Sequence, residues 1–379
     1  METFKNRISV AILSFFPKFT GTTITINYYY KALTDMGFRV KWYQLISDDN
    51  IDAYPNSDEF IKGINALPSS LRIPLDVVFV LPSKVMEMEE DILLITDQVA
   101  SNLCQHHNNS ITIVHDLRDL TKFNRSNLRK LYFTYVLRFL RNSSLIIAVS
   151  DYTREQLSEK LHIKNNVAVV PNCFPERKLF IRSKELADIG NLGKTDINVL
   201  YVTADRPYKN INLFLQIAKS INKRDLPRHY NFILVSRLKS GTMRKVKKMR
   251  LPNLQVLQDL PDINPLYEKT DILLFTSLIE GFGLPIIEAM SYGIPVIHAK
   301  LRPMTDVVEN GGISVDPDDT DAWIKALMII SEPETYREKS VAALNRAKNF
   351  EYEKFESKLK EVMKVYLEKR SFSFPVSKE

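Results

Sequence analysis

Short apolar runs alternate with helical patterns along the first half of the chain. The runs are rich in valine, isoleucine and leucine, and the segments between them repeat apolar residues at helical spacing. This alternation predicts parallel strands joined by helices. The expected strands are Arg7–Ser14, Arg39–Gln44, Leu75–Val80, Asp91–Ile95, Ile111–Val114, Leu145–Val149 and Val167–Val170, and the expected helices are Thr23–Met36, Lys122–Asn142 and Asp151–Leu161, the last capped by Ser150.

The same rhythm restarts in the second half of the chain. Residues 176–196 carry proline, glycine and mixed charge without periodicity, so we interpret them as a linker. The expected strands after the linker are Asn198–Thr203, Asn231–Ser236, Leu254–Leu257, Asp271–Phe275, Pro295–His298 and Ile313–Val315. We therefore expect an α/β protein with two Rossmann-like domains, at 1–175 and 197–350.

The charged segment 351–370 has a separate apolar pattern. Its large apolar residues recur at i, i+3 and i+4, which predicts an amphipathic helix that needs an apolar surface to cover. These residues are Tyr352, Phe355, Leu359, Val362, Met363 and Tyr366. We expect this helix to cross back onto the N-terminal domain.

Composition agrees with a two-domain globular protein. The chain has 379 residues, of which 45% are hydrophobic and 26% charged, which argues against disorder and fibrous structure. No apolar stretch has the length of a membrane-spanning helix, and the N-terminus does not have the pattern of a signal peptide, so we expect a cytoplasmic protein. Cys104 and Cys173, the two cysteines, are too few for a disulfide framework or a thiolate metal site.

The charge balance favours anionic partners. With 52 basic and 45 acidic residues the net charge is +7, a modest surplus that fits nucleotides or an acidic membrane surface better than DNA or RNA. The basic, aromatic segment Leu128–Arg141 leaves peripheral membrane contact open, on the cytoplasmic face. Its apolar residues occupy too many faces for an interfacial helix, however, which favours burial. The basic segment Arg237–Arg250 is equally compatible with a solvated face.

The stretch Ser277–Pro295 carries the clearest chemistry. It follows a buried strand and contains Gly281 and Gly283, which permit close backbone approach, and then Pro285, which suits a first helical turn. Free N–H groups at such a helix start bind anions such as a diphosphate. Glu280 precedes the helix and Glu288 is expected in its first turn. Carboxylates beside a phosphate site would repel the phosphate unless they bind hydroxyl groups. Sugar and ribose hydroxyls can donate hydrogen bonds to such carboxylates.

Two cations follow the first strand of the second half. Arg206 and Lys209 come directly after Asn198–Thr203, at the carboxyl edge of the predicted sheet, where open α/β folds bind ligands. Alone, such a pair is more often a solvated surface feature. Together with the glutamate-bearing loop, it predicts a site for a phosphorylated sugar.

The segment EGFGLPIIEAMSYGIPVI, with Glu280 and Glu288 eight positions apart, resembles the E-x7-E signature of retaining GT-B glycosyltransferases of the family 4 type (glycosyl transferases group 1). The resemblance implies two domains facing across a cleft, an acceptor-binding N-terminal domain and a nucleotide-sugar-binding C-terminal one. The chain departs from the family pattern around Gly21, at Asn172-Cys173 and at Ala204-Asp205, which leaves the substrate open.

The resemblance also implies roles for individual residues. Glu288 would bind ribose hydroxyls, and Arg206 and Lys209 would hold the diphosphate. Glu280 and the backbone of Gly281, Phe282, Gly283 and Leu284 would hold the donor sugar. His115, at the end of a strand, would face the reacting sugar, and Gly21 would start the helix after the first strand. The expected reaction transfers a hexose from a nucleoside-diphosphate sugar to a glycan, lipid or other acceptor, with retention by a front-face path.

Alternatives to this reading remain. Two carboxylates also suit a glycosidase, but nearby cations and N–H groups fit a departing diphosphate better. A degenerate protein that binds nucleotide sugars or glycans without turnover is a second candidate. No metal is expected, since Asp316 and Asp318, the one Asp-x-Asp pair considered, lie where helix capping explains them.

Overall fold

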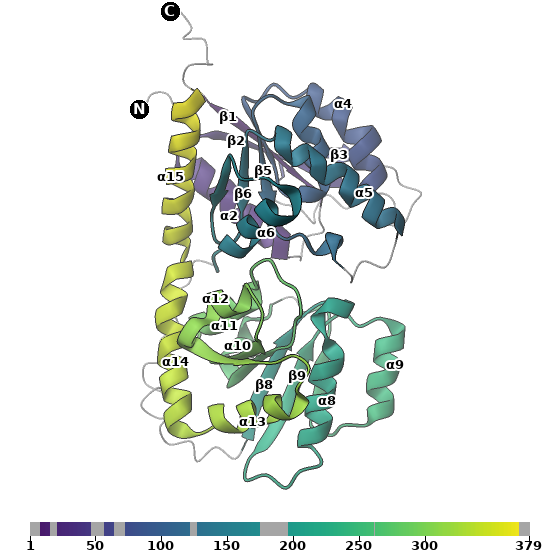
Figure 1. The fold of residues 1–379 in the computed structure, drawn as a ribbon, viewed down its shortest axis with the longest axis vertical. Coiled ribbons are helices and arrows are strands. Elements are labelled where there is room, and N and C mark those ends of the chain that lie inside the picture. Colours follow the sequence, from purple (N-terminus) through teal and green to yellow (C-terminus); the bar gives the residue numbers. More distant parts are fainter. Residues whose placement is uncertain are drawn as a thin grey trace, which may run out of the picture. The chain divides into compact units, whose positions relative to one another are not determined.

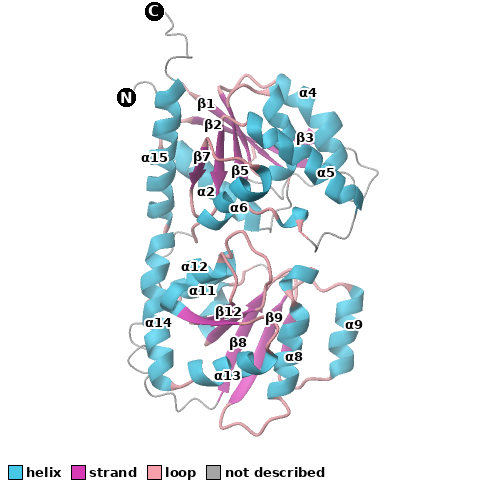
Figure 2. Cartoon of the chain, in the orientation of Figure 1, coloured by secondary structure: helices cyan, strands magenta, loops and turns pink. Residues whose placement is uncertain are grey.

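The computed structural model describes residues 8–15, 21–46, 57–63, 73–121, 127–174, 196–260 and 262–370. The chain divides into two compact units (Figure 1). The first unit is Met1–Cys173 together with Tyr352–Glu379, and the second is Phe174–Glu351. Helices flank the strands within each unit (Figure 2). Residues 175–195, nearly all of the expected linker, lie outside the described residues.

The first unit is built on a seven-stranded parallel sheet in the order β3-β2-β1-β4-β5-β6-β7. Its central strands are buried on both faces, which explains their near-continuous apolar sequences. The strand order reverses between β1 and β4, which are neighbours. The strands are β1 (Ser9–Ser14), β2 (Arg39–Ile46), β3 (Glu59–Lys62), β4 (Ile92–Ile95), β5 (Ser110–Val114), β6 (Leu145–Ala148) and β7 (Val167–Val169).

Most of the expected helices of the first unit form close to their predicted bounds. The cap of α6 is confirmed, because the Ser150 hydroxyl accepts a hydrogen bond from the Thr153 N–H at 3.1 Å. The long helix expected from Lys122 is described only from Asn127. The helical segments are α2 (Gly21–Asp35), a 3-10 helix (Gln98–His106), α5 (Asn127–Leu137), a 3-10 helix (Arg138–Asn142) and α6 (Asp151–Leu161).

The strand expected at Leu75–Val80 is wrong. Asp76–Val80 is a helical turn that continues into α4 (Leu81–Met86). Val77, Leu81 and Val85 are buried at intervals of four residues, so the apolar pattern is helical, whereas Phe79 is 71% exposed. A short apolar run fits either structure, and packing decides between them. The edge strand β3 was missed because its sequence, EFIK, is half polar.

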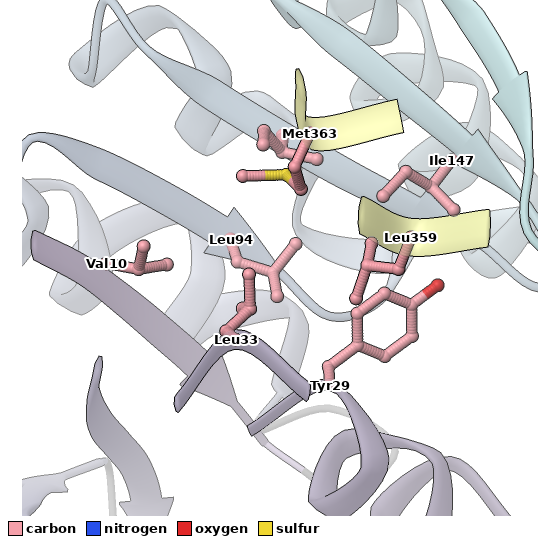
Figure 3. Close-up of a pocket in the computed structure, with 8 residues that line it drawn as sticks. Val10, Tyr29, Leu33, Leu94, Ile147, Leu359 and Met363 are labelled. Carbon is pink, nitrogen blue, oxygen red and sulfur yellow. The ribbon is translucent and has the colours of Figure 1, made fainter. Parts of the chain in front are cut away.

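The C-terminal helix α15 (Tyr352–Arg370) packs on the first unit, as expected. All six apolar residues of its predicted stripe are buried. Tyr29 of α2 meets the ring of Phe355 edge-on, with 5.0 Å between centroids. Figure 3 shows Leu359 and Met363 of α15 converging with Tyr29 and Leu33 of α2 and with side chains of the central strands. The stripe therefore covers the sheet beside α2.

The second unit contains a six-stranded parallel sheet in the order β10-β9-β8-β11-β12-β13. The order reverses between β8 and β11, and open α/β sheets bind ligands beyond the carboxyl ends of strands at such a point. The strands are β8 (Asp196–Val202), β9 (His229–Val235), β10 (Leu254–Leu257), β11 (Ile272–Phe275), β12 (Val296–Ala299) and β13 (Gly312–Val315). The helices are α8 (Ile211–Ile221), α9 (Ser240–Met249), α10 (Asn264–Lys269), α11 (Leu284–Ser291), α12 (Met304–Val308), α13 (Thr320–Ile330) and α14 (Pro333–Ala347).

Candidate functional site

The loops after β8 and β11 meet at the point where the strand order of the second sheet reverses. The buried Tyr201, on β8, donates a hydrogen bond to the Lys209 carbonyl at 2.5 Å. The Leu278 N–H, after β11, donates to the Tyr208 carbonyl at 2.7 Å. These bonds fix the basic loop against the loop that carries the glutamates.

Lys209 and Glu280, both predicted from the sequence, form an ion pair with 2.5 Å between Nζ and Oε1. The two side chains are only 16% and 9% exposed. Burial, the largest single influence, would lower the Lys209 pKa, but the charge of Glu280 and its hydrogen bond, together with the nearby Tyr201 and Tyr208, outweigh it, and the pKa is raised. Lys209 therefore stays charged, and its ammonium group has further protons for an anionic ligand. No pattern in the sequence indicated that these two residues pair.

The glycine loop turns the chain into α11. Gly283 has φ +102°, and a Cβ there would lie 3.0 Å from Ile286 Cδ1, so a side chain would be strained. No side chain caps the helix, which has Pro285 in its first turn. Gly281 and Leu284 flank this turn, while Phe282 is buried and meets the ring of Phe350 edge-on. The packing of Phe282 thus fixes the start of α11. Backbone groups, without a capping side chain, lie at the N-terminus of this helix.

Glu288 lies in the second turn of α11, not in the first turn where it was expected. Its Oε2 atom accepts a hydrogen bond from the Tyr267 hydroxyl at 2.7 Å. Tyr267 is buried in α10, and burial, followed by the charge of Glu288, raises its pKa well above the ordinary value. The phenol therefore remains a hydrogen-bond donor. Tyr267 was not identified from the sequence, where a lone tyrosine in a short helix gives no functional signal.

Arg206 reaches a different environment from Lys209. It is exposed, and among the described residues it forms no salt bridge. The neighbouring Asp205 carboxylate accepts a hydrogen bond from the Lys239 N–H at 2.8 Å, which ties this loop to the start of α9. The guanidinium of Arg206 is therefore an accessible positive charge, three positions before Lys209 in the same loop.

His115 and Gly21 belong to the first unit. His115 follows β5, and its Nε2 atom lies 2.9 Å from the Thr96 carbonyl, which can only accept, so Nε2 carries a proton. Burial lowers the His115 pKa, which favours the neutral ring with Nδ1 as acceptor. Gly21 is the exposed first residue of α2, and its carbonyl accepts a hydrogen bond from Thr25 Oγ1. Residues 16–20, before it, lie outside the described residues.

Asp97 is a candidate that the sequence analysis missed. It follows β4, the neighbour of β5 in the sheet, so it lies at the same edge as His115. Its side chain is 5% exposed and accepts a hydrogen bond from the Val99 N–H at 2.9 Å. Burial raises the Asp97 pKa to about 7. Its position two residues after a buried strand was the available signal.

Neither Asp316 nor Asp318 caps the helix that follows, although the Asp316 carboxylate has a local contact. Asp316 Oδ1 accepts a hydrogen bond from the Asp318 N–H at 2.9 Å, and Asp319 caps α13 by accepting from the Ala322 N–H. Within the described ranges, no cluster of three or more histidine, cysteine or acidic residues could hold a metal ion. Nor does any described helix have the length and apolar character needed to cross a membrane.

Both halves of the chain match protein-family models. Residues 19–177 match the model described as Glycosyltransferase Family 4, and residues 182–350 match that described as Glycosyl transferases group 1. Among solved structures, sucrose-phosphate synthase from Thermosynechococcus elongatus superposes with a TM-score of 0.77, at 18% identity, over 96% of this chain and all of that one. Anabaena HepE, in complex with UDP and glucose, gives 0.74 at 18% identity over 95% of this chain and all of that one. The expected GT-B fold is therefore confirmed.

Curated relatives are similar over parts or most of the chain. The O-antigen chain mannosyltransferase RfbU of Salmonella typhimurium is 28% identical over 239 residues, which is 59% of this chain and 61% of that protein. An uncharacterized glycosyltransferase of Methanocaldococcus jannaschii is 24% identical over 90% of this chain and 93% of that protein. The match thus spans about three fifths of the Salmonella enzyme.

Proposed function

We propose that this chain, a GT-B protein whose halves match the glycosyltransferase family 4 and group 1 models, transfers a hexose from a nucleoside-diphosphate sugar to an acceptor with retention of configuration. The observation that carries the proposal is the buried Lys209–Glu280 pair beside the uncapped start of α11, at the switch point of the second sheet. Cations and N–H groups suit a departing diphosphate, and carboxylates suit sugar hydroxyls.

Each site residue has a proposed part in this reaction. Lys209 and Arg206 hold the diphosphate and absorb its growing charge as the sugar leaves. Glu280 and the backbone of 281–284 hold the donor sugar, and Glu288 accepts hydrogen bonds from the ribose. The departing phosphate takes the acceptor's proton on the same face, so the path needs neither a protein nucleophile nor a metal. His115 has a proposed role toward the reacting sugar, and Gly21 toward the donor.

The donor is proposed to be a UDP- or GDP-linked hexose. UDP is named for the HepE complex and for the complex of a pneumococcal O-GlcNAc transferase, and mannosyl transfer is named for the Salmonella relative. The acceptor is proposed to be a glycan, a lipid or a protein.

A donor screen tests the proposal. The protein is incubated with UDP- and GDP-hexoses and simple glycan or lipid acceptors, and the anomeric configuration of the product is read by NMR. We expect one donor to be used, with an α-linked donor giving an α-linked product. Inversion would overturn the front-face mechanism. Tight nucleotide binding without transfer or hydrolysis would support the alternative of a non-catalytic binding protein.

We also propose contact between α5 and an anionic membrane surface on the cytoplasmic side. One face of α5 is buried, as expected, but Leu128 and Leu131 are 74% and 68% exposed, and Tyr135, on the same helix face as these leucines, is 38% exposed. No acidic residue occurs in residues 127–142, and the Arg138 guanidinium lies 4.4 Å from the centroid of the Tyr135 ring. Of the basic residues in this segment, Arg129 pairs with Asp119 at 3.2 Å. Exposed apolar residues beside basic ones suit an interfacial helix.

Co-sedimentation with vesicles tests this contact. Leu128→Ser with Leu131→Ser should reduce binding to vesicles that contain phosphatidylglycerol by more than fivefold. Ile329→Ser, which replaces an apolar residue 47% exposed on α13, serves as the control and should bind like the native protein. Equal binding by the α5 variant and the native protein would contradict the proposal.

A further inference from the structure

The buried tyrosine Tyr267 links α10 to the carboxylate of Glu288. The two residues are 21 positions apart and lie on helices separated by β11. The hydroxyl of Tyr267 donates to Glu288 Oε2 at 2.7 Å, a length typical of a charge-assisted hydrogen bond. Glu288 itself is only partly buried, so its carboxylate reaches both the protein interior and the site.

The ring of Tyr267 has little freedom to move. It is 1% exposed and stacks on Tyr292, with 5.5 Å between centroids and 24° between planes. The Tyr292 hydroxyl in turn lies 3.4 Å from Asn264 Oδ1, in the first turn of α10. Tyr267 thus reaches from α10 to α11, and Tyr292 reaches from the end of α11 to α10. These contacts hold the hydroxyl of Tyr267 in a fixed position.

We propose that Tyr267 is a positioning residue that fixes the Glu288 carboxylate for binding the ribose of the donor nucleotide. This inference rests on the proposed function, in which Glu288 accepts the ribose hydroxyls. A glutamate side chain has three rotatable bonds, and holding one oxygen in place removes freedom that ligand binding would otherwise have to remove. A preorganised carboxylate binds the nucleotide more tightly without contacting the reacting atoms.

This role predicts a specific kinetic pattern. The ribose does not change during sugar transfer, so its contacts stabilise the ground state and the transition state equally. Tyr267→Phe should therefore raise KM for the donor and Kd for the nucleoside diphosphate about tenfold, while kcat changes less than twofold. The ring stack on Tyr292 is retained in this variant, because only the hydroxyl is removed.

The control is a phenol of the same kind elsewhere in the second unit. Tyr230 is 5% exposed, and its hydroxyl lies 3.3 Å from Ser331 Oγ. Tyr230→Phe also removes a buried tyrosine hydroxyl, so a general loss of stability would appear in both variants. Only Tyr267→Phe should weaken nucleotide binding.

A double-mutant cycle gives the decisive result. Calorimetry with UDP and GDP is performed on the native protein, Tyr267→Phe, Glu288→Ala and the double variant. We expect Tyr267→Phe to weaken binding in the native background and to change Kd less than twofold once Glu288 is alanine. An equal effect in both backgrounds would overturn positioning through Glu288, as would native affinity in Tyr267→Phe. If the native protein binds neither nucleotide, the proposed function fails, and the inference fails with it.

Discussion

The Lys209 ammonium lies 2.5 Å from the Glu280 carboxylate, although 71 positions separate the two residues. The pair joins the loop after β8 to the loop after β11, and it is largely shielded from water. A buried charge is costly unless its partner is present, so the pair contributes both to the shape of the site and to the stability of the second unit.

Replacing Lys209 alone should therefore destabilise the second unit. We expect Lys209→Met to cost about 3 kcal/mol, the lower end for breaking a buried pair, because the site keeps some solvent contact. Urea unfolding in a Trp42→Phe background lets Trp323, buried in the second unit, report this change. Adding Glu280→Gln should restore at least half of the loss. If Lys209→Met unfolds like the native protein, the pair is not a stabilising contact.

Arg206 should matter more for turnover than for binding. Its exposed charge is proposed to stabilise the departing diphosphate, so Arg206→Ala should lower kcat about 100-fold, the scale of losing one such donor, and change donor Kd less than about threefold. Arg237→Ala removes another exposed arginine, paired with Asp259, and should leave kcat unchanged. Equal losses in kcat and affinity for Arg206→Ala would indicate simple docking of the phosphates.

The strands and the terminal helix were predictable because their patterns are local. A buried parallel strand needs a continuous apolar run, and a helix on a sheet needs an apolar stripe, as in α15. Ser150 is a local signal of the same kind, since its hydroxyl caps the helix that follows it directly. The turn into α11 was also predictable from Gly283, because this turn requires a left-handed backbone conformation that glycine adopts without strain.

The contacts that tune the site were not predictable. The Lys209–Glu280 pair and the Tyr267–Glu288 hydrogen bond join loops and helices distant in sequence, and no spacing rule records them. The prediction of a strand at Leu75–Val80 was wrong for a related reason. A short apolar run fits a strand or a helix, and the packing of the surrounding elements decides between them. Exposure of Leu128 and Leu131 likewise depends on which face of α5 meets the sheet.

Divalent metal ions should be dispensable for activity. Lys209, Arg206 and the N-terminus of α11 can compensate the charge that develops on the diphosphate without a coordination shell. After exhaustive chelation, we expect the enzyme to keep most of its activity with its best donor. Loss of activity that only manganese or magnesium restores would contradict the proposed mechanism and direct attention to Asp316 and Asp318.

Asp97 should make the first unit less stable as the pH rises. Its pKa is raised from 3.8 to about 7, so between these values the native state keeps a proton that the unfolded chain has lost, and stability falls with increasing pH before levelling off above about 7. The loss is on the order of 4 kcal/mol.

Asp97→Asn keeps an acceptor for the Val99 N–H and has no charge to bury, so it should match the native protein near pH 4 and exceed it in stability at pH 8. Urea unfolding of both proteins in a Trp323→Phe background, with Trp42 reporting the first unit, measures the difference. The same pH dependence in both proteins would show that Asp97 ionises normally in the folded state.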